Sequence, residues 1–312
     1  MGDLSFDFRL SPDEEALRPP KRVTIHAHSV HGITHMEWTP DGRLLASAFG
    51  GGYVVDVTEG GNMRGAKPFA WNLRHPAGLL TNYQGNRTLI SDTGRGVVLD
   101  ITKGGDAMEA PVFFAGVPGP YGLLSYQGEV FCTFSGGEDS GPVQLENGLV
   151  RMEEGGCFSE DKIRVRGFPN GLREMPYVMS MNGNKAGDCG CWTAVGYQGK
   201  MLYLHAGLGT VFDITNHTSW SPNMPFLANG LKKPLGMITH PTNGHLYVAE
   251  RGGECVKVVP HDADGVTKKY DMRFVPPVAC GFGEPSCVRF HPDGSCMYVC
   301  DFKLGFVWKV EF

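Results

Sequence analysis

Short apolar segments alternate with polar turns along almost the whole chain. A typical unit has one apolar segment, a turn such as Pro40-Asp41-Gly42 or Pro292-Asp293-Gly294, and a second apolar segment such as 246–250. Strands of this kind, separated by Gly, Asp and Asn turns about every 8–12 residues, are typical of antiparallel sheets. The pattern therefore predicts an all-β fold.

The segments repeat with a fixed period. Three of them end almost identically, at Asp56-Val57-Thr58, Asp100-Ile101-Thr102 and Asp213-Ile214-Thr215. The first two aspartates are 44 residues apart (100 − 56) and the third is 113 further on (213 − 100), which fits two more units and an insertion. Such a period indicates a propeller or a solenoid. Aligned copies predict a six-bladed β-propeller of four-stranded antiparallel blades, which start near residues 31, 75, 119, 190, 233 and 284.

The ends of the chain complete this arrangement. The last copy, 287–312, supplies only three strands, while 23–26 has the pattern of a strand just before the first copy. We expect this N-terminal strand to close the last blade, because closure leaves no long sheet edge exposed. Residues 1–20 then form an N-terminal extension and 21–312 a single propeller domain. Fourth strands are predicted at 69–71, 112–114, 163–165, 225–227 and 272–274.

Charge and composition restrict the partners. The 312 residues carry 28 Lys and Arg against 33 Asp and Glu, a net charge of −5. Nucleic acid and anionic membranes select clustered basic residues, so neither is expected as a partner. We find no signal peptide at the N-terminus and no run of about 18 apolar residues. The nine cysteines lack the spacing of a disulfide framework, so a cytoplasmic protein is expected.

The second strands resemble those of a known group. Residues 246–253 (LYVAERGG) and 297–302 (MYVCDF) are similar to the second strand of NHL repeats and of gluconolactonase and strictosidine synthase-like six-bladed propellers. The resemblance covers most of 21–312 and implies the fold. Activity has to be argued from the site, because one scaffold carries many unrelated functions.

A propeller gathers distant residues at one mouth of its channel, where the second strands end and the first strands begin. The first strands begin at His31, His75, Tyr121, Trp192, Leu235 and Ser286. The second strands end at Ala48, Asp92, Phe134, Ala206, Glu250 and Asp301, and are followed by Phe49, Thr93, Ser135, Gly207, Arg251 and Phe302. Apolar groups with a few convergent polar groups predict a pocket for a mainly apolar small molecule.

The candidate catalytic residues are His31, His75, Asp92 and Glu250. Imidazoles transfer protons near neutral pH, although either histidine could instead cap a turn. The carboxylates could act as bases, but the resemblance also implies that such acids brace the following turn by accepting backbone N–H bonds. The candidate substrate-binding residues are Phe49, Tyr121, Phe134, Tyr177, Met179, Trp192, Arg251, Asp301 and Phe302; Arg251 could instead form an ion pair with Glu250.

An insertion at about 167–190 interrupts the template. It contains Met175, Tyr177, Met179 and Met181, and such side chains adapt to irregular apolar shapes. We interpret it as a lid over the channel. The alternative is an elaboration of blade three that packs on the rim.

The resemblance to metal-dependent lactonases suggests a divalent-ion site only in part. Glu284 and Asn170 are its possible ligands and Ca²⁺ or Mg²⁺ its possible ions. Glu284-Pro285 lacks the Gly that separates these residues in the lactonases, and no Asp matches the third ligand. We therefore expect no cofactor.

Three functions remain. The first is a metal-independent lyase or cyclase of specialised metabolism, which performs an elimination, condensation or cycloaddition in the channel. The second is a divalent-metal-dependent, lactonase-like hydrolase. The third is a non-catalytic interaction scaffold.

Overall fold

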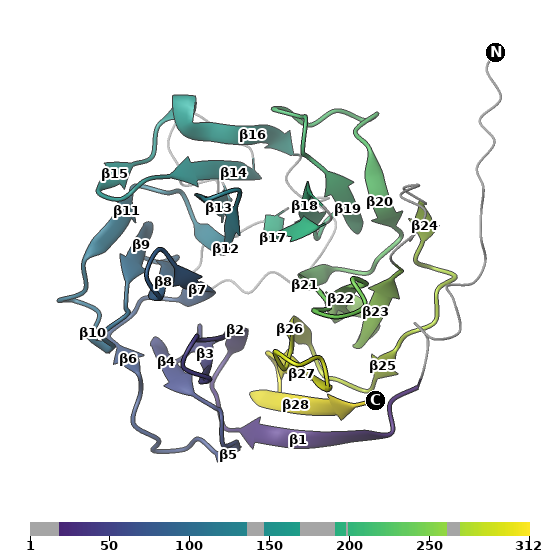
Figure 1. Ribbon diagram of the computed structural model, residues 1–312, viewed down its shortest axis with the longest axis horizontal. Coiled ribbons are helices and arrows are strands. Elements are labelled where there is room, and N and C mark those ends of the chain that lie inside the picture. Colours follow the sequence, from purple (N-terminus) through teal and green to yellow (C-terminus); the bar gives the residue numbers. More distant parts are fainter. Residues whose placement is uncertain (1–18, 136–146, 169–190, 198, 261–268) are drawn as a thin grey trace.

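Six small sheets stand in a ring in this computed structural model, which describes residues 19–135, 147–168, 191–197, 199–260 and 269–312 (Figure 1). Blade one contains β2 (Ile33–Trp38), β3 (Leu44–Ala48), β4 (Tyr53–Asp56) and β6 (Ala70–Trp71), and blade two contains β7 (Pro76–Tyr83), β8 (Arg87–Asp92), β9 (Val97–Asp100) and β11 (Val112–Ala115). Blade three contains β12 (Pro120–Tyr126), β13 (Glu129–Phe134), β14 (Asn147–Met152) and β16 (Ile163–Phe168), and blade four contains β17 (Cys191–Tyr197), β18 (Lys200–His205), β19 (Thr210–Asp213) and β20 (Phe226–Asn229).

Blade five contains β21 (Pro234–Thr239), β22 (Leu246–Glu250), β23 (Cys255–Val259) and β25 (Ala279–Cys280). Blade six contains β26 (Pro285–Phe290), β27 (Cys296–Asp301), β28 (Phe306–Glu311) and β1 (Arg22–His28). The predicted six-bladed fold is confirmed. The closing strand is confirmed too, since β1 pairs antiparallel with β28 and places the first described strand outermost in the last blade.

Neighbouring blades are also joined by strand pairing along their outer edges. Short parallel strands reach back to the outer strand of the preceding blade: β5 (Gly61–Asn62) pairs with β1, β10 (Gly105–Asp106) with β6, β15 (Gly156–Cys157) with β11, and β24 (Tyr270–Asp271) with β20. The predicted outer strand at 272–274 is therefore wrong. That part of the chain follows β24, the short strand that pairs with blade four, and the outer strand of blade five is β25.

The repeated Asp-x-Thr motif forms the same hydrogen bonds at the end of the third strand in three blades. In blade two, Asp100 Oδ1 accepts bonds from Thr102 N (3.0 Å) and Thr102 Oγ1 (2.5 Å), while Thr102 Oγ1 accepts a bond from Thr88 N (2.9 Å). Blades one and four repeat these bonds with Asp56 and Thr58, and with Asp213 and Thr215. The motif therefore recurs because it fastens the end of the third strand to the start of the second.

Hydrophobic packing joins each blade to the next. The described residues form six apolar clusters, and each cluster combines side chains from two neighbouring blades. Between blades six and one, for example, Ile33 and Met36 pack with Cys287 and Cys300, all at 0% exposure. The ring is therefore stabilised blade against blade. No helix in the described part of the chain is both long and apolar enough to cross a membrane.

Candidate functional site

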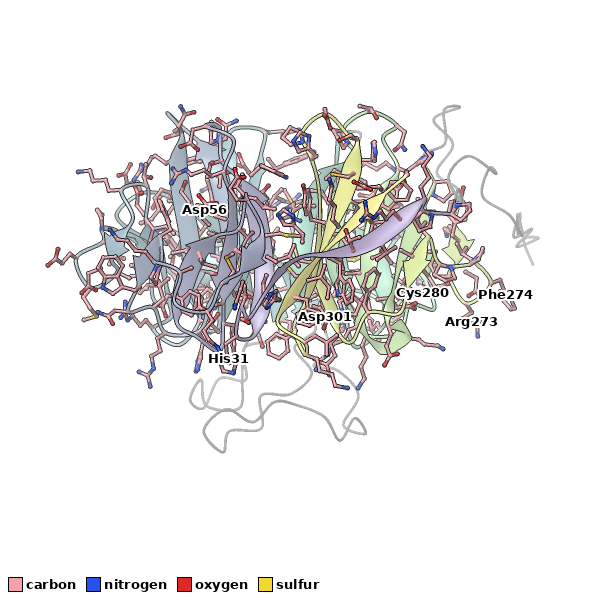
Figure 2. All side chains as sticks on the ribbon, turned by 90° about the horizontal axis from the view of Figure 1, so that it is seen from below. His31, Asp56, Arg273, Phe274, Cys280 and Asp301 are labelled. Carbon is pink, nitrogen blue, oxygen red and sulfur yellow. The ribbon has the colours of Figure 1, made fainter. Side chains whose placement is uncertain are left out.

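The two sets of loops predicted to meet at the mouth do meet. In blades one, two, three, five and six, the residue after the second strand donates a backbone bond to the residue before the first strand, for example Thr93 N to His75 O (3.2 Å) and Phe302 N to Glu284 O (2.9 Å). Figure 2 shows His31 and Asp301 toward one face of the ring and Asp56 toward the other. The loops before the first strands and after the second strands therefore share a face, although they are far apart in the sequence.

The register corrects the alignment at two places. In blade four, Cys191 pairs with His205, so the second strand ends at His205 rather than Ala206. His205 is fully buried, and its Nδ1 accepts a bond from Leu208 N (3.0 Å). In this register Gly207-Leu208 of blade four corresponds to Gly252-Gly253 of blade five, and the sequence alignment was shifted by one residue here.

The second correction concerns the first strands. The register shifts after the first residue pair in every blade, so the next residue of the first strand lies at a β-bulge. Tyr121, Leu235 and Ser286 occupy this position, and Thr34 and Ala77 are their counterparts in blades one and two. His31 and His75 instead lie in the loops just before the first strands.

Seven residues follow one another along the mouth, and we call them the mouth arc: Arg251, Glu284, Phe302, His31, Phe49, His75 and Tyr121. Both ends of the arc are direct side-chain contacts, and its middle runs through the backbone of Gly32 and Gly50. Arg251 forms an ion pair with Glu284 (2.6 Å), and its guanidinium lies 6.0 Å from the centroid of the Phe302 ring. Phe302 borders Gly32, since a Cβ at Gly32 would lie 3.5 Å from Phe302 Cε2. The arc thus leads from blade five through blade six to blade one.

The other part of the mouth arc consists of aromatic rings from blades one, two and three. His31 lies against Gly50, where a Cβ would be 3.0 Å from the His31 ring, and Phe49 precedes Gly50. Phe49 stacks on His75 with ring centroids 4.8 Å apart and an angle of 17° between the planes. Tyr121 lies 6.2 Å from Phe49 at a tilt of 36°. Phe49, His75 and Tyr121 are therefore in ring contact, while His31 and Phe302 lie beside them against Gly50 and Gly32.

The two histidines differ in environment. His31 is exposed, and the described residues offer its ring no hydrogen-bond partner. His75 is half-buried beneath Phe49 and has a left-handed backbone with φ 59°. The same position is occupied by Gly32 (φ 64°) in blade one, Gly119 (φ 52°) in blade three and Lys233 (φ 47°) in blade five. A side chain in this conformation costs about 1–2 kcal/mol, a cost that His75 shares with Lys233.

The buried carboxylates brace the loops before the first strands. Asp92 accepts bonds from Arg74 N (2.9 Å) and Arg95 N (3.1 Å), and its burial raises the pKa of its carboxyl above the usual value. Glu250 Oε1 accepts a bond from Lys232 N (2.6 Å). Each donor, Arg74 or Lys232, stands two residues before the proline that opens the first strand. Asp92 therefore braces the following turn as expected and the loop before the first strand as well, whereas Glu250 binds the backbone of the loop before the first strand instead of the following turn.

Asp301 braces the corresponding loop in blade six and accepts hydrogen bonds from more donors. Its oxygens accept bonds from Gly283 N (2.6 Å), Glu284 N (3.0 Å), Leu304 N (3.1 Å) and Trp308 Nε1 (3.1 Å). The side chain is 0% exposed. Both oxygens are thus occupied, and Asp301 is held within the rim rather than presented on its surface.

Other predicted substrate-binding residues do not join the mouth arc. Phe134 is 1% exposed and packs in the cluster between blades two and three, with its ring 5.4 Å from Phe158. The structure therefore assigns Phe134 to the core. Tyr177, Met179 and most of the predicted lid lie outside the described residues, as does the side chain of Trp192; the lid's first two residues, 167 and 168, belong to β16. The predicted Arg251–Glu250 ion pair is wrong, because Arg251 pairs with Glu284 and Glu250 with Lys257 (3.4 Å).

The residues at the suggested ion site do not fit a divalent cation as they stand. The Glu284 carboxylate is already paired with the Arg251 guanidinium, whose positive charge would repel an ion there. Asn170 lies outside the described residues. Within the described ranges, no three His, Cys, Asp or Glu side chains are grouped to hold a metal.

Comparison with solved structures agrees with the fold. A gluconolactonase from Xanthomonas campestris superimposes with a TM-score of 0.61 and 13% identity, covering 97% of this chain and 94% of that one. A luciferin-regenerating enzyme gives 0.63 and 14%, covering 93% and 95%. Virginiamycin B lyase from Staphylococcus aureus gives 0.52 and 11%, covering 93% and 98%. No protein-family model and no curated protein matches the sequence. The chain thus shares the six-bladed fold of gluconolactonase-like propellers, as its second strands implied.

Proposed function

We propose that this protein is a metal-independent enzyme of specialised metabolism that binds an apolar or aromatic small molecule at the mouth and performs a lyase or cyclase type of reaction. The observation that carries the proposal is the Phe49–His75 stack, which unites a flat apolar surface and an imidazole. Tyr121 extends this surface, and the exposed His31 borders it across Gly50.

The chemistry follows from two imidazoles beside one apolar surface. In an elimination, one imidazole takes a proton from a substrate carbon, the electron pair of that bond forms a double bond, and the leaving group departs with a proton from the other imidazole. In a cyclisation, the aromatic surface holds two reacting groups in contact. Positioning of this kind can lower a barrier by about 7–11 kcal/mol, so few catalytic groups suffice.

The buried acids support this site indirectly. Asp92 binds Arg74 N, and the next residue is His75, so Asp92 fixes the loop that carries the imidazole. Asp301 fixes the loop that carries Glu284 in the same way. In this proposal Asp92 is a positioning residue. Glu250 has the same role in blade five, where it holds the loop that contains Lys232.

Two observations separate this proposal from its alternatives. The Arg251–Glu284 ion pair disfavours a lactonase-like hydrolase, because a metal ion bound by Glu284 would have to displace the Arg251 guanidinium. The solved structures that share this fold include a gluconolactonase and a virginiamycin B lyase. Both are enzymes, which favours an enzyme over a scaffold for this protein.

The test is a screen of aromatic and apolar metabolites by thermal shift, followed by product analysis for each compound that binds. We expect wild type to convert at least one compound and both His31→Ala and His75→Ala to lose conversion. His291→Ala is the matched control, because His291 lies in the turn between β26 and β27, away from the mouth, and pairs with Asp293 (2.7 Å).

The outcomes are distinct. Conversion that survives in both histidine variants contradicts the assignment of the site. Conversion that a chelator abolishes and Ca²⁺ or Mg²⁺ restores supports the lactonase-like alternative. Failure to convert any compound, with stoichiometric capture of a protein partner, supports the scaffold.

A further inference from the structure

Two free cysteines face each other across the outer strands of blade five. Cys255 on β23 is the direct register partner of Cys280 on β25. The neighbouring backbone bond runs from Gly281 N to Glu254 O (3.1 Å), which marks the two cysteines as a non-hydrogen-bonded pair. Such pairs have Cα atoms about 4.5 Å apart, with both side chains on one face of the sheet. This spacing falls within the range of about 4.4–6.8 Å that a disulfide requires.

The two thiols differ in accessibility and reactivity. Cys280 is exposed on β25, the outer strand of blade five (Figure 1), whereas Cys255 is 3% exposed. Burial, together with a bond from Cys255 Sγ to Glu250 Oε2 (3.1 Å), raises the pKa of the Cys255 thiol to about 12. Cys255 is therefore a poor first nucleophile. An external reagent meets Cys280 first.

We propose that Cys255 and Cys280 form a reversible disulfide by exchange with a small disulfide such as oxidised glutathione. The Cys280 thiolate attacks one glutathione sulfur, a mixed disulfide forms, and one glutathione thiolate leaves. Glu250 then takes the proton of Cys255, whose sulfur attacks Cys280 Sγ, and the second glutathione leaves and is protonated. Two protein thiols are oxidised and one glutathione disulfide is reduced to two thiols, so electrons and protons balance.

The disulfide reaches the mouth through a single row of residues. Glu250 is the register partner of Cys255, which is the partner of Cys280. The same carboxylate accepts the bond from Lys232 N in the loop before β21 (2.6 Å). Oxidation removes the Cys255 donor from Glu250, while Lys257 Nζ remains 3.4 Å from Glu250 Oε2. Oxidation at the outer edge of blade five therefore alters the bonding of a carboxylate that also holds a loop of the rim.

The test treats the purified full chain with oxidised glutathione and maps its peptides after alkylation. We expect a tryptic peptide of residues 252–257 linked to one of residues 274–289, and complete reversal by a dithiol reductant. The second peptide also contains Cys287, so the variants decide which sulfur is bound. Cys280→Ser, at an exposed position, must lose the link. Cys157→Ser, which removes the other exposed cysteine among the described residues, must keep it.

A third variant tests the order of the steps. In Cys255→Ser the mixed disulfide has no sulfur to resolve it, so we expect a stable adduct of one glutathione on Cys280. The proposal is overturned if the treated wild type yields no link between these peptides, or if the link persists in Cys280→Ser. It is also overturned if wild type and Cys255→Ser accumulate the same glutathione adduct.

Discussion

Phe49 and His75 stack face to face across the boundary between blades one and two, with ring centroids 4.8 Å apart. Phe49 follows the second strand of blade one, and His75 precedes the first strand of blade two. The contact joins an apolar surface to an imidazole, and it spans two units of the repeat. The proposed chemistry depends on this contact.

The first prediction concerns how Phe49 covers His75. In Phe49→Ala the imidazole loses one face of its packing, so we expect diethyl pyrocarbonate to acylate His75 about two- to tenfold faster, as an aromatic pair of this kind contributes about 0.5–1.5 kcal/mol. Peptide mapping measures the rate at His75, and the exposed His31 serves as an internal reference. An unchanged His75 rate would show that the two rings do not stack in solution.

The second prediction concerns backbone strain at His75. Both His75→Gly and His75→Ala remove the ring, but only Ala retains a side chain at φ 59°. We expect His75→Gly to be more stable than His75→Ala by about 1 kcal/mol, since a left-handed backbone penalises a Cβ by about that amount. Chemical denaturation measures the difference. Equal stabilities would mean that position 75 relaxes out of the left-handed region.

The third prediction concerns acid stability. At Asp100 burial acts to raise the pKa, but the bonds from Thr102 and Arg87 outweigh it and hold the pKa below the usual 3.8; Asp213 is lowered in the same way by Thr215 and Lys200. A lowered folded-state pKa stabilises the protein above the unfolded value and loses that stabilisation as the pH falls. We therefore expect wild type to lose stability below about pH 4 more steeply than a double Asp100→Asn, Asp213→Asn variant.

The measurement is the free energy of unfolding as a function of pH for both proteins. The variant should be less stable than wild type at neutral pH, and the two curves should converge in acid. Parallel curves throughout this range would contradict the role of these two carboxylates.

The fourth prediction concerns Asp301. Asp301→Ala leaves four partly buried N–H donors without an acceptor, and we expect a loss of about 3 kcal/mol or more, because each buried unsatisfied donor costs about 1–3 kcal/mol. The exposed Asp293, in the turn at the opposite end of β27, is the control: Asp293→Ala should change stability much less than Asp301→Ala does. If the two variants were equally stable, Asp301 would not be a brace.

The sequence by itself determined the repeat and therefore the architecture. The Asp-x-Thr motif and the periodic turns reflect bonds within one blade, and such local bonds recur wherever the same short strands recur. The incomplete last copy likewise predicted that an N-terminal strand closes the ring, because an unpaired edge would otherwise remain. The same alignment brought His31, His75, Asp92 and Glu250 to one face of the ring, although it placed the two histidines at the start of the first strands rather than in the loops before them.

Only the tertiary structure decided what each of these residues does at the mouth. Asp92 and Glu250 differ from exposed bases because backbone N–H groups of the loops before the first strands occupy them. Phe134 occupies the corresponding position in blade three but points into the core. A period states which residues are equivalent along the chain; the shifts in register, the left-handed backbone at His75 and the packing between blades determine which side chains meet.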